Sequence, residues 1–359
     1  MRDPERILIV KLSSIGDVVQ SLPVAAALRR RFPGSYLAWA VGPPAADVLI
    51  GNPHLNDVLV IGGRGRPTVG AHGDVPLSAP PRAASLPPLS SPAALRQAFR
   101  PFRFDVSLDL QGLFKSAAVA YLSGAGDRIG FRTLHEGTFL LNNHRVVPNR
   151  RDVHAVDSYL DFAEALGAPR QPVEFTISIS DDDRKAVDSL VGAQAELAAI
   201  IPGARWESKL WPAARFGAVA QALAEQFSVT AVIVGGPGDA GLAREIAQVS
   251  RTEVLDLTGK TTLKQAAEVL RRCRVTIGND TGPLYLSAAM GTPTVAIFGP
   301  SDARRLGPYG PGHAKVVAEI ECAPCRNRRC SRRRCMEMIE PARVIEAARA
   351  LLLARQVEA

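Results

Sequence analysis

The chain has 359 residues, 47% of them hydrophobic and 22% charged, which is typical of a globular protein and enough for two domains with separate cores. It contains no apolar run long enough to cross a bilayer, and its polar start, MRDPER, lacks the features of a signal peptide, so we expect a cytoplasmic protein. The net charge of +8 favours a nucleotide, phosphorylated saccharide, acidic membrane or nucleic acid as partner, although an arginine-rich codon usage explains it equally well.

The first half alternates short β-branched runs with helical patterns. Strands are expected at residues 6–12, 35–41, 57–62 and 104–110. An amphipathic helix is expected over residues 18–31, and such alternation is typical of a parallel, doubly wound sheet. Residues 62–92 are rich in Pro, Gly, Ser and Ala without any period, which predicts a flexible surface insertion or a lid.

The second half repeats the pattern. Strands are expected within residues 195–203, 228–239, 252–259, 274–282 and 292–300. A helical join near residues 149–173 divides an α/β domain at 1–172 from a second one at 173–359. Two such Rossmann-like halves imply a cleft between them, and open α/β sheets bind ligands beyond the carboxyl ends of their strands.

Three corners at strand ends could carry chemistry, because the chain has neither the G-x-G-x-x-G fingerprint after its first strand nor a Walker A sequence. The first corner contains Ser13, Ser14, Gly16 and Asp17. These residue types suit a phosphate cradle, a catalytic base or ordinary helix capping, and all three interpretations stay open here.

The third corner places Asp280, Thr281 and Gly282 at the start of a helix, where free N–H groups suit a diphosphate and where plain N-capping fits as well. In the second corner, Lys209 follows a strand end, and its ammonium suits a phosphate leaving group, although most lysines are simply solvated. Its neighbours Trp206 and Trp211 either pack the loop or offer a face to a base or sugar.

Several short motifs occur in a characteristic order: KLSSIGDVV, DLQGLFKS, DRIGF, PGARWESKLWP, GGPGD, GNDTGPLYLSAAMGTPTVAIFGP and PYG. From Ile7 to Leu352, with the insertion as an interruption, the chain resembles the ADP-heptose:lipopolysaccharide heptosyltransferases of glycosyltransferase family nine. The resemblance implies a GT-B fold, with an N-terminal acceptor domain and a C-terminal nucleotide-sugar domain facing across a cleft. It also implies metal-independent, inverting transfer of a heptose from ADP-heptose to a lipid-linked core saccharide in lipopolysaccharide biosynthesis, with peripheral contact to the anionic inner membrane.

The resemblance also assigns roles to residues. The catalytic acid of the family falls on Asp17, the phosphate-binding lysine on Lys209, and a nucleoside-contacting acid on Asp239. The family's donor-binding triplet falls on Asp280, Thr281 and Gly282. Ser13, Ser14 and the backbone around Gly16 would shape a corner for phosphate or acceptor.

A helix N-terminus lowers the pKa of a carboxyl group, which makes Asp17 a weaker base unless proton transfer comes late in the reaction.

Two departures from the family pattern affect the substrate. Tyr285 stands where many relatives have His, and Ala204 and Arg205 replace Thr-type residues, so the donor sugar or the acceptor could differ.

Four cysteines, Cys322, Cys325, Cys330 and Cys335, have the spacing C-x2-C-x4-C-x4-C with six arginines between them. Arginine lowers the pKa of nearby thiols, and four thiolates suit a structural Zn or Fe, whereas reduced thiols or a strained disulfide are the alternatives. Two rival functions remain. The first is nucleic-acid binding by this basic element, which lacks interleaved aromatic residues, and the second is an epimerase or hydrolase of nucleotide sugars with the same fold.

Overall fold

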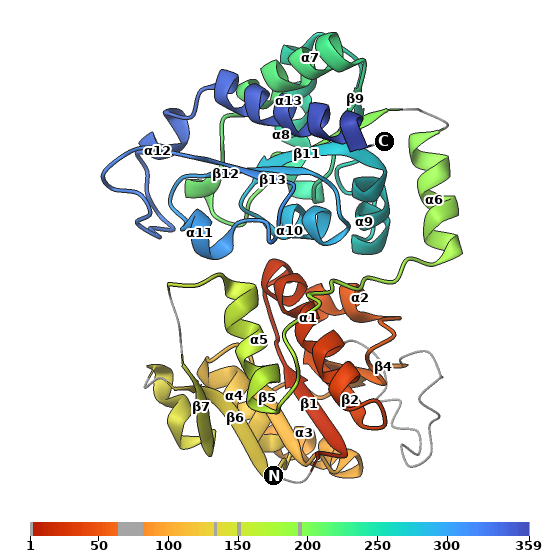
Figure 1. Cartoon of the computed structure of the whole chain (residues 1–359), viewed down its shortest axis with the longest axis vertical. Coiled ribbons are helices and arrows are strands. Elements are labelled where there is room, and N and C mark those ends of the chain that lie inside the picture. Colours follow the sequence, from red (N-terminus) through yellow and green to blue (C-terminus); the bar gives the residue numbers. More distant parts are fainter. Residues whose placement is uncertain (1–2, 64–81, 133–134, 149–151, 193–195, 359) are drawn as a thin grey trace. The chain divides into compact units, whose positions relative to one another are not determined.

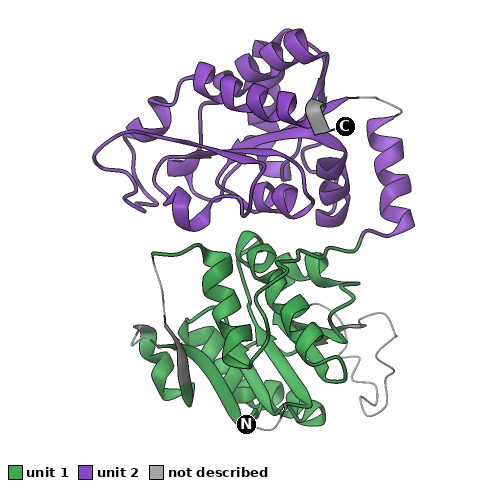
Figure 2. Ribbon diagram, in the orientation of Figure 1, with its two compact units in different colours: residues 1–178 green, residues 179–359 purple. Residues whose placement is uncertain are grey.

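The computed structural model describes residues 3–63, 82–132, 135–148, 152–192 and 196–358, and Figure 1 labels its helices and strands. The chain forms two compact units, unit 1 from Met1 to Ser178 and unit 2 from Ile179 to Ala359 (Figure 2). The sequence analysis placed the domain boundary a few residues earlier, at 172/173. None of the helices in the described ranges combines the length and apolarity needed to span a membrane.

Unit 1 contains a seven-stranded sheet in the order β4-β3-β2-β1-β5-β6-β7, and every neighbouring pair is parallel. Its elements are β1 (Arg6–Val10), α1 (Ile15–Arg31), β2 (Tyr36–Val41), α2 (Pro43–Leu49), β3 (Asp57–Ile61), β4 (Arg82–Leu86), α3 (Pro92–Phe99), η1 (Arg100–Phe102), β5 (Val106–Asp109), α4 (Phe114–Leu122), β6 (Asp127–Arg132), η2 (His135–Leu140), β7 (His144–Pro148) and α5 (Ala155–Ala165).

The strand order of unit 1 creates a switch point at β1. The chain proceeds from β1 through β2 and β3 toward one edge of the sheet, then returns to place β5 on the other side of β1. Helices leave the carboxyl ends of β1 and β5 in opposite directions, which opens a crevice there in doubly wound folds. The loop that contains Asp17 follows β1, so the topology puts it at this switch point.

The predicted insertion at residues 62–92 is only partly an insertion. Residues 64–81 lie outside the described residues, but Arg82–Leu86 form β4, which pairs with β3 at the sheet edge. Ala84 and Leu86 are buried in the unit 1 core, and α3 begins at Pro92. The prediction is wrong for these residues because pairing with β3 and burial of two apolar side chains override the weak strand preference of RAASL.

Unit 2 contains a six-stranded parallel sheet in the order β10-β9-β8-β11-β12-β13. Its elements are α6 (Asp181–Val191), β8 (Leu197–Ile201), η3 (Glu207–Lys209), α7 (Ala213–Phe227), β9 (Thr230–Ile233), η4 (Pro237–Asp239), α8 (Ala240–Ser250), β10 (Val254–Asp256), α9 (Leu263–Arg272), β11 (Cys273–Asn279), α10 (Gly282–Ala289), β12 (Thr294–Phe298), α11 (Ala303–Leu306), β13 (His313–Val317), α12 (Arg334–Glu337) and α13 (Pro341–Glu358).

Helices cover both faces of the unit 2 sheet. Figure 1 shows α7, α8 and α13 on one face and α9 and α10 on the other. The core under α7 and α13 includes Trp211 and Phe216, whose rings meet edge to face with centroids 4.8 Å apart. Here the switch point lies between β8 and β11, so the loops that follow these two strands meet at the carboxyl ends of the strands.

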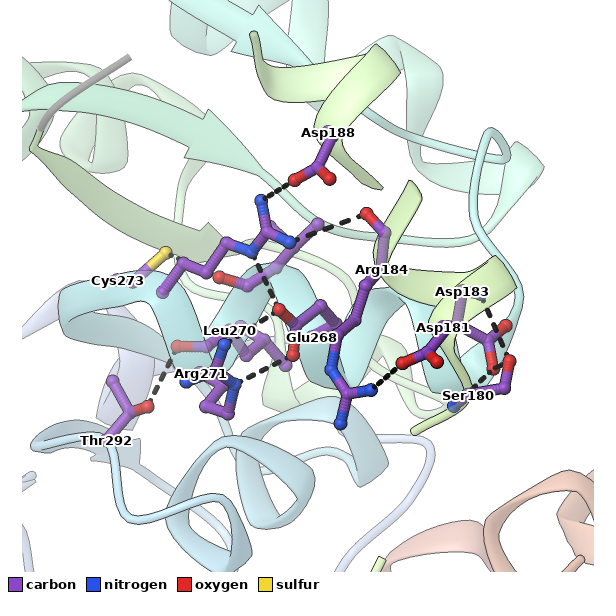
Figure 3. Close-up of polar contacts among 12 residues, drawn as sticks. Ser180, Asp181, Asp183, Arg184, Asp188, Glu268, Leu270, Arg271, Cys273 and Thr292 are labelled. Carbon is purple, nitrogen blue, oxygen red and sulfur yellow. Dashed lines mark hydrogen bonds and ion pairs between the residues drawn. The ribbon is translucent and has the colours of Figure 1, made fainter. Parts of the chain in front are cut away.

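A buried carboxylate ties α9 to α6 (Figure 3). Glu268, whose side chain is 1% exposed, accepts hydrogen bonds from Arg271 at 2.7 Å and from Arg272 at 2.7 Å. Arg272 also pairs with Asp188 of α6 at 2.6 Å. Burial by itself raises the pKa of Glu268, but the hydrogen bonds and charges of both arginines outweigh it, so its pKa lies below the ordinary value.

We therefore expect Glu268→Gln to make unit 2 less sensitive to acid. Since the folded pKa of Glu268 is lowered, its contribution to stability is present above the ordinary carboxyl pKa and is lost as pH falls through the folded value. The variant should lose about 1–3 kcal/mol of stability at pH 7, and the difference from wild type should shrink as the pH approaches 4. Urea unfolding at both pH values measures this. Glu225→Gln, at an exposed position on α7, is the control, and an equal loss at both pH values for Glu268→Gln would contradict the assignment.

Candidate active site

The loop after β1 is fixed by a side chain from the neighbouring strand end. Gln111, which follows β5, accepts hydrogen bonds from the backbone N–H groups of Leu12 at 2.8 Å and Ser13 at 3.2 Å. Gln111 itself lies in a tight turn around Asp109, whose carboxylate accepts the N–H groups of Gln111 and Gly112. The motif DLQG thus sets the path of the motif LSSIGD across the switch point of unit 1.

The carboxylate of Asp17 is held on both oxygens. Ser14 donates to Oδ2 through its backbone N–H at 3.0 Å and its hydroxyl at 2.7 Å, while the Tyr159 hydroxyl of α5 donates to Oδ1 at 3.2 Å. The contacts with Ser14 form a capping box at the start of α1, so the capping interpretation is confirmed. They also fix the carboxylate in one orientation beside Ser13, Ser14 and Gly16, the residues that the sequence analysis grouped with it.

Lys11 connects to this carboxylate through Tyr159. The Lys11 side chain is buried, with 4% exposure of the residue, and its Nζ donates to the Leu110 carbonyl at 3.1 Å and to the Tyr159 hydroxyl at 2.9 Å. Burial by itself raises the pKa of Asp17, but the charge of Lys11 and the hydrogen bonds from Ser14 and Tyr159 bring that pKa below its ordinary value. Asp17 is therefore ionised at neutral pH, which a proton acceptor requires.

Three residues of this corner were missing from the predicted site: Lys11, Gln111 and Tyr159. Lys11 and Gln111 lie within two of the quoted motifs, so their motif membership was a signal that could have found them. Tyr159 lies far along the chain in a helix with ordinary amphipathic spacing, and its role depends on the packing of α5 against α1, which no local pattern reveals.

Unit 2 has a cavity of about 250 Å³ at its own switch point. Its lining comes from the loops after β8, β9 and β11, namely Ile201, Gly203, Ala204, Arg205, Gly235, Gly236, Asp239, Thr281 and Pro283. Ala204 and Arg205, which together form one of the two departures from the family pattern, therefore lie on the cavity wall. Of the predicted site residues, Asp239 and Thr281 meet here.

Asp239 is seated against two glycines. Its Oδ2 accepts the backbone N–H of Gly236 at 2.8 Å. A Cβ atom on Gly203 or on Gly235 would overlap the Asp239 carboxylate, so both positions need glycine for this close approach. The carboxylate thus lies at the cavity wall in a fixed position, where it can accept hydrogen bonds from a ligand.

Asp280 is paired rather than acting as a helix cap. Lys209 of η3 donates to Asp280 Oδ2 at 2.6 Å, and the hydroxyl of Tyr285 donates to Asp280 Oδ1. Both charged side chains are largely buried, with 14% exposure for Lys209 and 5% for Asp280. Tyr285 thereby positions the acid that orients Lys209, and Lys209 is not the solvated lysine of the alternative interpretation.

The first turn of α10 borders the cavity without a side-chain cap. Thr281 occupies the N-cap position, but its side chain makes no capping hydrogen bond, and Gly282 begins the helix. Thr281 and Pro283 line the cavity, so the N-terminal end of α10 lies at the cavity wall. First-turn N–H groups carry partial positive charge, and this end of the helix can therefore accept an anion.

The two tryptophans of the second corner have different environments. Trp211 is 1% exposed, and its indole N–H donates to the Ile339 carbonyl at 2.9 Å, so it packs the core. Trp206 is only half-buried and has two cationic groups over its ring, Lys209 Nζ and Arg328 Cζ, each 4.4 Å from the centroid. Trp206 therefore lies beside Lys209 and outside the packed core.

The four cysteines are free thiols and range from exposed (Cys322 and Cys325) to buried (Cys335). In the described part of the chain, no group of three or more Cys, His, Asp or Glu side chains is arranged to hold a metal ion. Burial and the neighbouring thiols raise the pKa of Cys335, so the expectation that arginines lower the pKa is wrong for this thiol. The reason is its position in the unit 2 core, where it packs with Met336.

Comparison with known proteins decides the family. The sequence model described as Glycosyltransferase family 9 (heptosyltransferase) matches residues 93–335, about two thirds of the chain. The chain belongs to glycosyltransferase family 9. This family 9 chain is 23% identical over 313 residues to the lipopolysaccharide core heptosyltransferase OpsX of Haemophilus influenzae, covering 85% of this chain and 82% of the relative.

Solved structures show the same fold. A family 9 glycosyltransferase from Veillonella parvula superposes with a TM-score of 0.82 at 24% identity, covering 98% of both chains. The structure described as E. coli heptosyltransferase WaaC with ADP gives a TM-score of 0.71 at 22% identity, covering 96% of this chain and 99% of that one. The expected GT-B type α/β fold with two Rossmann-like domains is confirmed.

Proposed function

We propose that this family 9 member is an inverting, metal-independent glycosyltransferase that moves a heptose from ADP-heptose to a saccharide acceptor of the lipopolysaccharide core. The observation that carries the proposal is the cavity of unit 2, which combines an uncapped helix N-terminus with a fixed carboxylate. A relative of the same fold has been solved with ADP and with ADP-2-deoxy-2-fluoro heptose.

In this proposal, unit 2 binds the donor. The N-terminal end of α10 at Thr281 and Gly282 takes the diphosphate, with Lys209 supplying a positive charge that it shares with Asp280. Asp239 accepts hydrogen bonds from the nucleoside. Tyr285 replaces the histidine of many relatives, and Ala204 and Arg205 offer a different cavity wall, so these three positions would adjust which sugar is accepted.

Unit 1 supplies the proton acceptor. The acceptor hydroxyl attacks the anomeric carbon on the face opposite the diphosphate, and its proton passes to the Asp17 carboxylate as the new C–O bond forms. The bond from the anomeric carbon to the phosphate oxygen breaks, and its electron pair leaves on ADP, where Lys209 and the α10 N-terminus balance the added negative charge. Ser14 and Tyr159 keep the Asp17 oxygens oriented throughout.

The acceptor is proposed to be lipid-linked, which would bring the enzyme to an anionic membrane surface on the cytoplasmic side. The exposed arginines between Cys322 and Cys335 support peripheral contact, because basic residues are attracted to acidic lipid headgroups. A structural Zn or Fe at the four cysteines stays a prediction that elemental analysis of the purified protein would test. As arranged here, these side chains do not fit such an ion, and no catalytic step is assigned to one.

A thermal-shift screen tests the donor assignment. ADP and ADP-heptose should raise the melting temperature, because a ligand at 100 times its Kd adds about 2.7 kcal/mol to the free energy of unfolding. UDP and GDP should raise the melting temperature much less. Release of ADP from ADP-heptose with a core saccharide acceptor then tests transfer. Stabilisation by UDP in preference to ADP, or no response to any nucleotide, would overturn the proposal.

A further inference from the structure

The loop that contains the cysteines and arginines reaches the donor site of unit 2. Arg328 lies in this loop, which connects β13 to α12, and its guanidinium carbon is 4.4 Å from the centroid of the Trp206 ring. Lys209 lies at the same distance from the same ring. The two cationic centres are therefore no further apart than twice that distance.

The middle of this loop is anchored at the end of β12. Arg326 donates its backbone N–H to the carbonyl of Pro300, just after β12, at 2.8 Å. A Cβ atom on Gly299 would overlap Cys335 and Met336, so the far end of the loop also packs closely against the end of β12. β12 pairs with β11, which ends at Asn279 beside Asp280. The loop and the donor residues therefore both lie at the carboxyl ends of the strands of this sheet.

The positive charges around Trp206 favour the binding of an anion. Lys209 is neutralised in part by Asp280, whereas Arg328 is exposed and, among the described residues, forms no ion pair with a carboxylate. Two cations near one indole repel each other, and an anion that contacts both of them relieves this repulsion. Arg205 on the cavity wall adds a third positive group.

We infer that Arg328 is a binding residue for the diphosphate of the nucleotide sugar, held in readiness by stacking on Trp206. This inference rests on the proposed function of the unit 2 cavity. A planar guanidinium can donate two parallel hydrogen bonds to a phosphate, which the ammonium of Lys209 cannot do. Ala204 has no hydroxyl to offer on the cavity wall, and Arg328 would add hydrogen-bond donors to those of Arg205 and Thr281.

Tryptophan fluorescence of the full-length protein can test the inference directly. Of the three tryptophans, Trp39 and Trp211 are fully buried, which leaves Trp206 as the reporter of a ligand at this edge. Inorganic pyrophosphate and ADP serve as probes, and both should change the emission of wild-type protein. Arg328→Ala should raise the Kd of both probes about tenfold, and Arg328→Lys should recover only part of the lost affinity.

Arg329→Ala is the matched control, because Arg329 is the next residue of the same loop, is equally exposed and carries the same charge. Its Kd values should stay within a factor of two of wild type. If Arg328→Ala binds as well as wild type, or if Arg329→Ala loses as much as Arg328→Ala, the inference is wrong while the donor assignment stands. If wild-type protein binds neither probe, the donor assignment itself fails.

Discussion

Replacing Asp17 with alanine is expected to reduce kcat for sugar transfer by about 10³-fold or more, the range for loss of a positioned general base, while the Kd for ADP changes by less than a factor of two. The reason is that the two sites lie in different units, with Asp17 in unit 1 and the donor cavity in unit 2. Single-turnover kinetics with ADP-heptose, together with calorimetry of ADP binding, measures both quantities.

The same substitution removes a capping box, so a structural effect has to be separated from a chemical one. α6 provides the control, because Ser180 donates to Asp183 through its backbone N–H and its hydroxyl just as Ser14 does to Asp17. Asp183→Ala should cost a similar stability of about 1 kcal/mol and leave kcat unchanged. If Asp17→Ala retains wild-type turnover, or if Asp183→Ala loses as much activity, the assignment of Asp17 as base fails.

Replacing Lys209 with methionine is expected to have two separable effects. It leaves the Asp280 carboxylate buried without its cation, which should destabilise unit 2 by about 3 kcal/mol. It also removes a cation from the diphosphate site, so the Kd for ADP should rise about tenfold or more. Chemical denaturation measures the first effect and calorimetry the second.

A second substitution tells these effects apart. In the double variant Lys209→Met with Asp280→Asn, the buried charge is gone, and the amide oxygen can still accept the hydrogen bond from Tyr285. Stability should return to near wild type, but ADP binding should stay weak. Lys260→Met, at an exposed lysine of the same unit, should affect neither quantity. Recovery of ADP binding in the double variant would mean that Lys209 acts only on the structure.

Most central strands of the two sheets could be predicted from sequence, whereas most edge strands could not. Expected strands correspond to β1, β2, β3 and β5 in unit 1 and to β8, β9, β10, β11 and β12 in unit 2. The missed strands are β4, β7 and β13 at sheet edges and β6 next to an edge, while the edge strand β10 was predicted. A central parallel strand is buried on both faces and leaves a continuous apolar run, but an edge strand such as HAKVV of β13 mixes polar residues into its pattern.

The candidate site was predictable where its residues lie in strand-end turns, because parallel strands bring such turns together. Asp17, Lys209 and Thr281 were proposed from such turns, and Asp239 was proposed from the family resemblance. Tyr159 and Arg328 were not, since each reaches its site from a helix or loop that tertiary packing brings there. A local sequence pattern indicates the residue type, but it does not indicate which distant segments of the chain tertiary packing brings to the site.

The loop with Arg328 leaves the sheet after β13 and is held at two points near the end of β12. The backbone of Arg326 bonds to Pro300, and Cys335 packs against Gly299. The stretch between these two anchors, residues 327–334, can therefore change in length and sequence while the strands beneath it keep their register. Exchanging this one segment between family members would therefore change the affinity for the diphosphate without altering the sheet that carries the rest of the site.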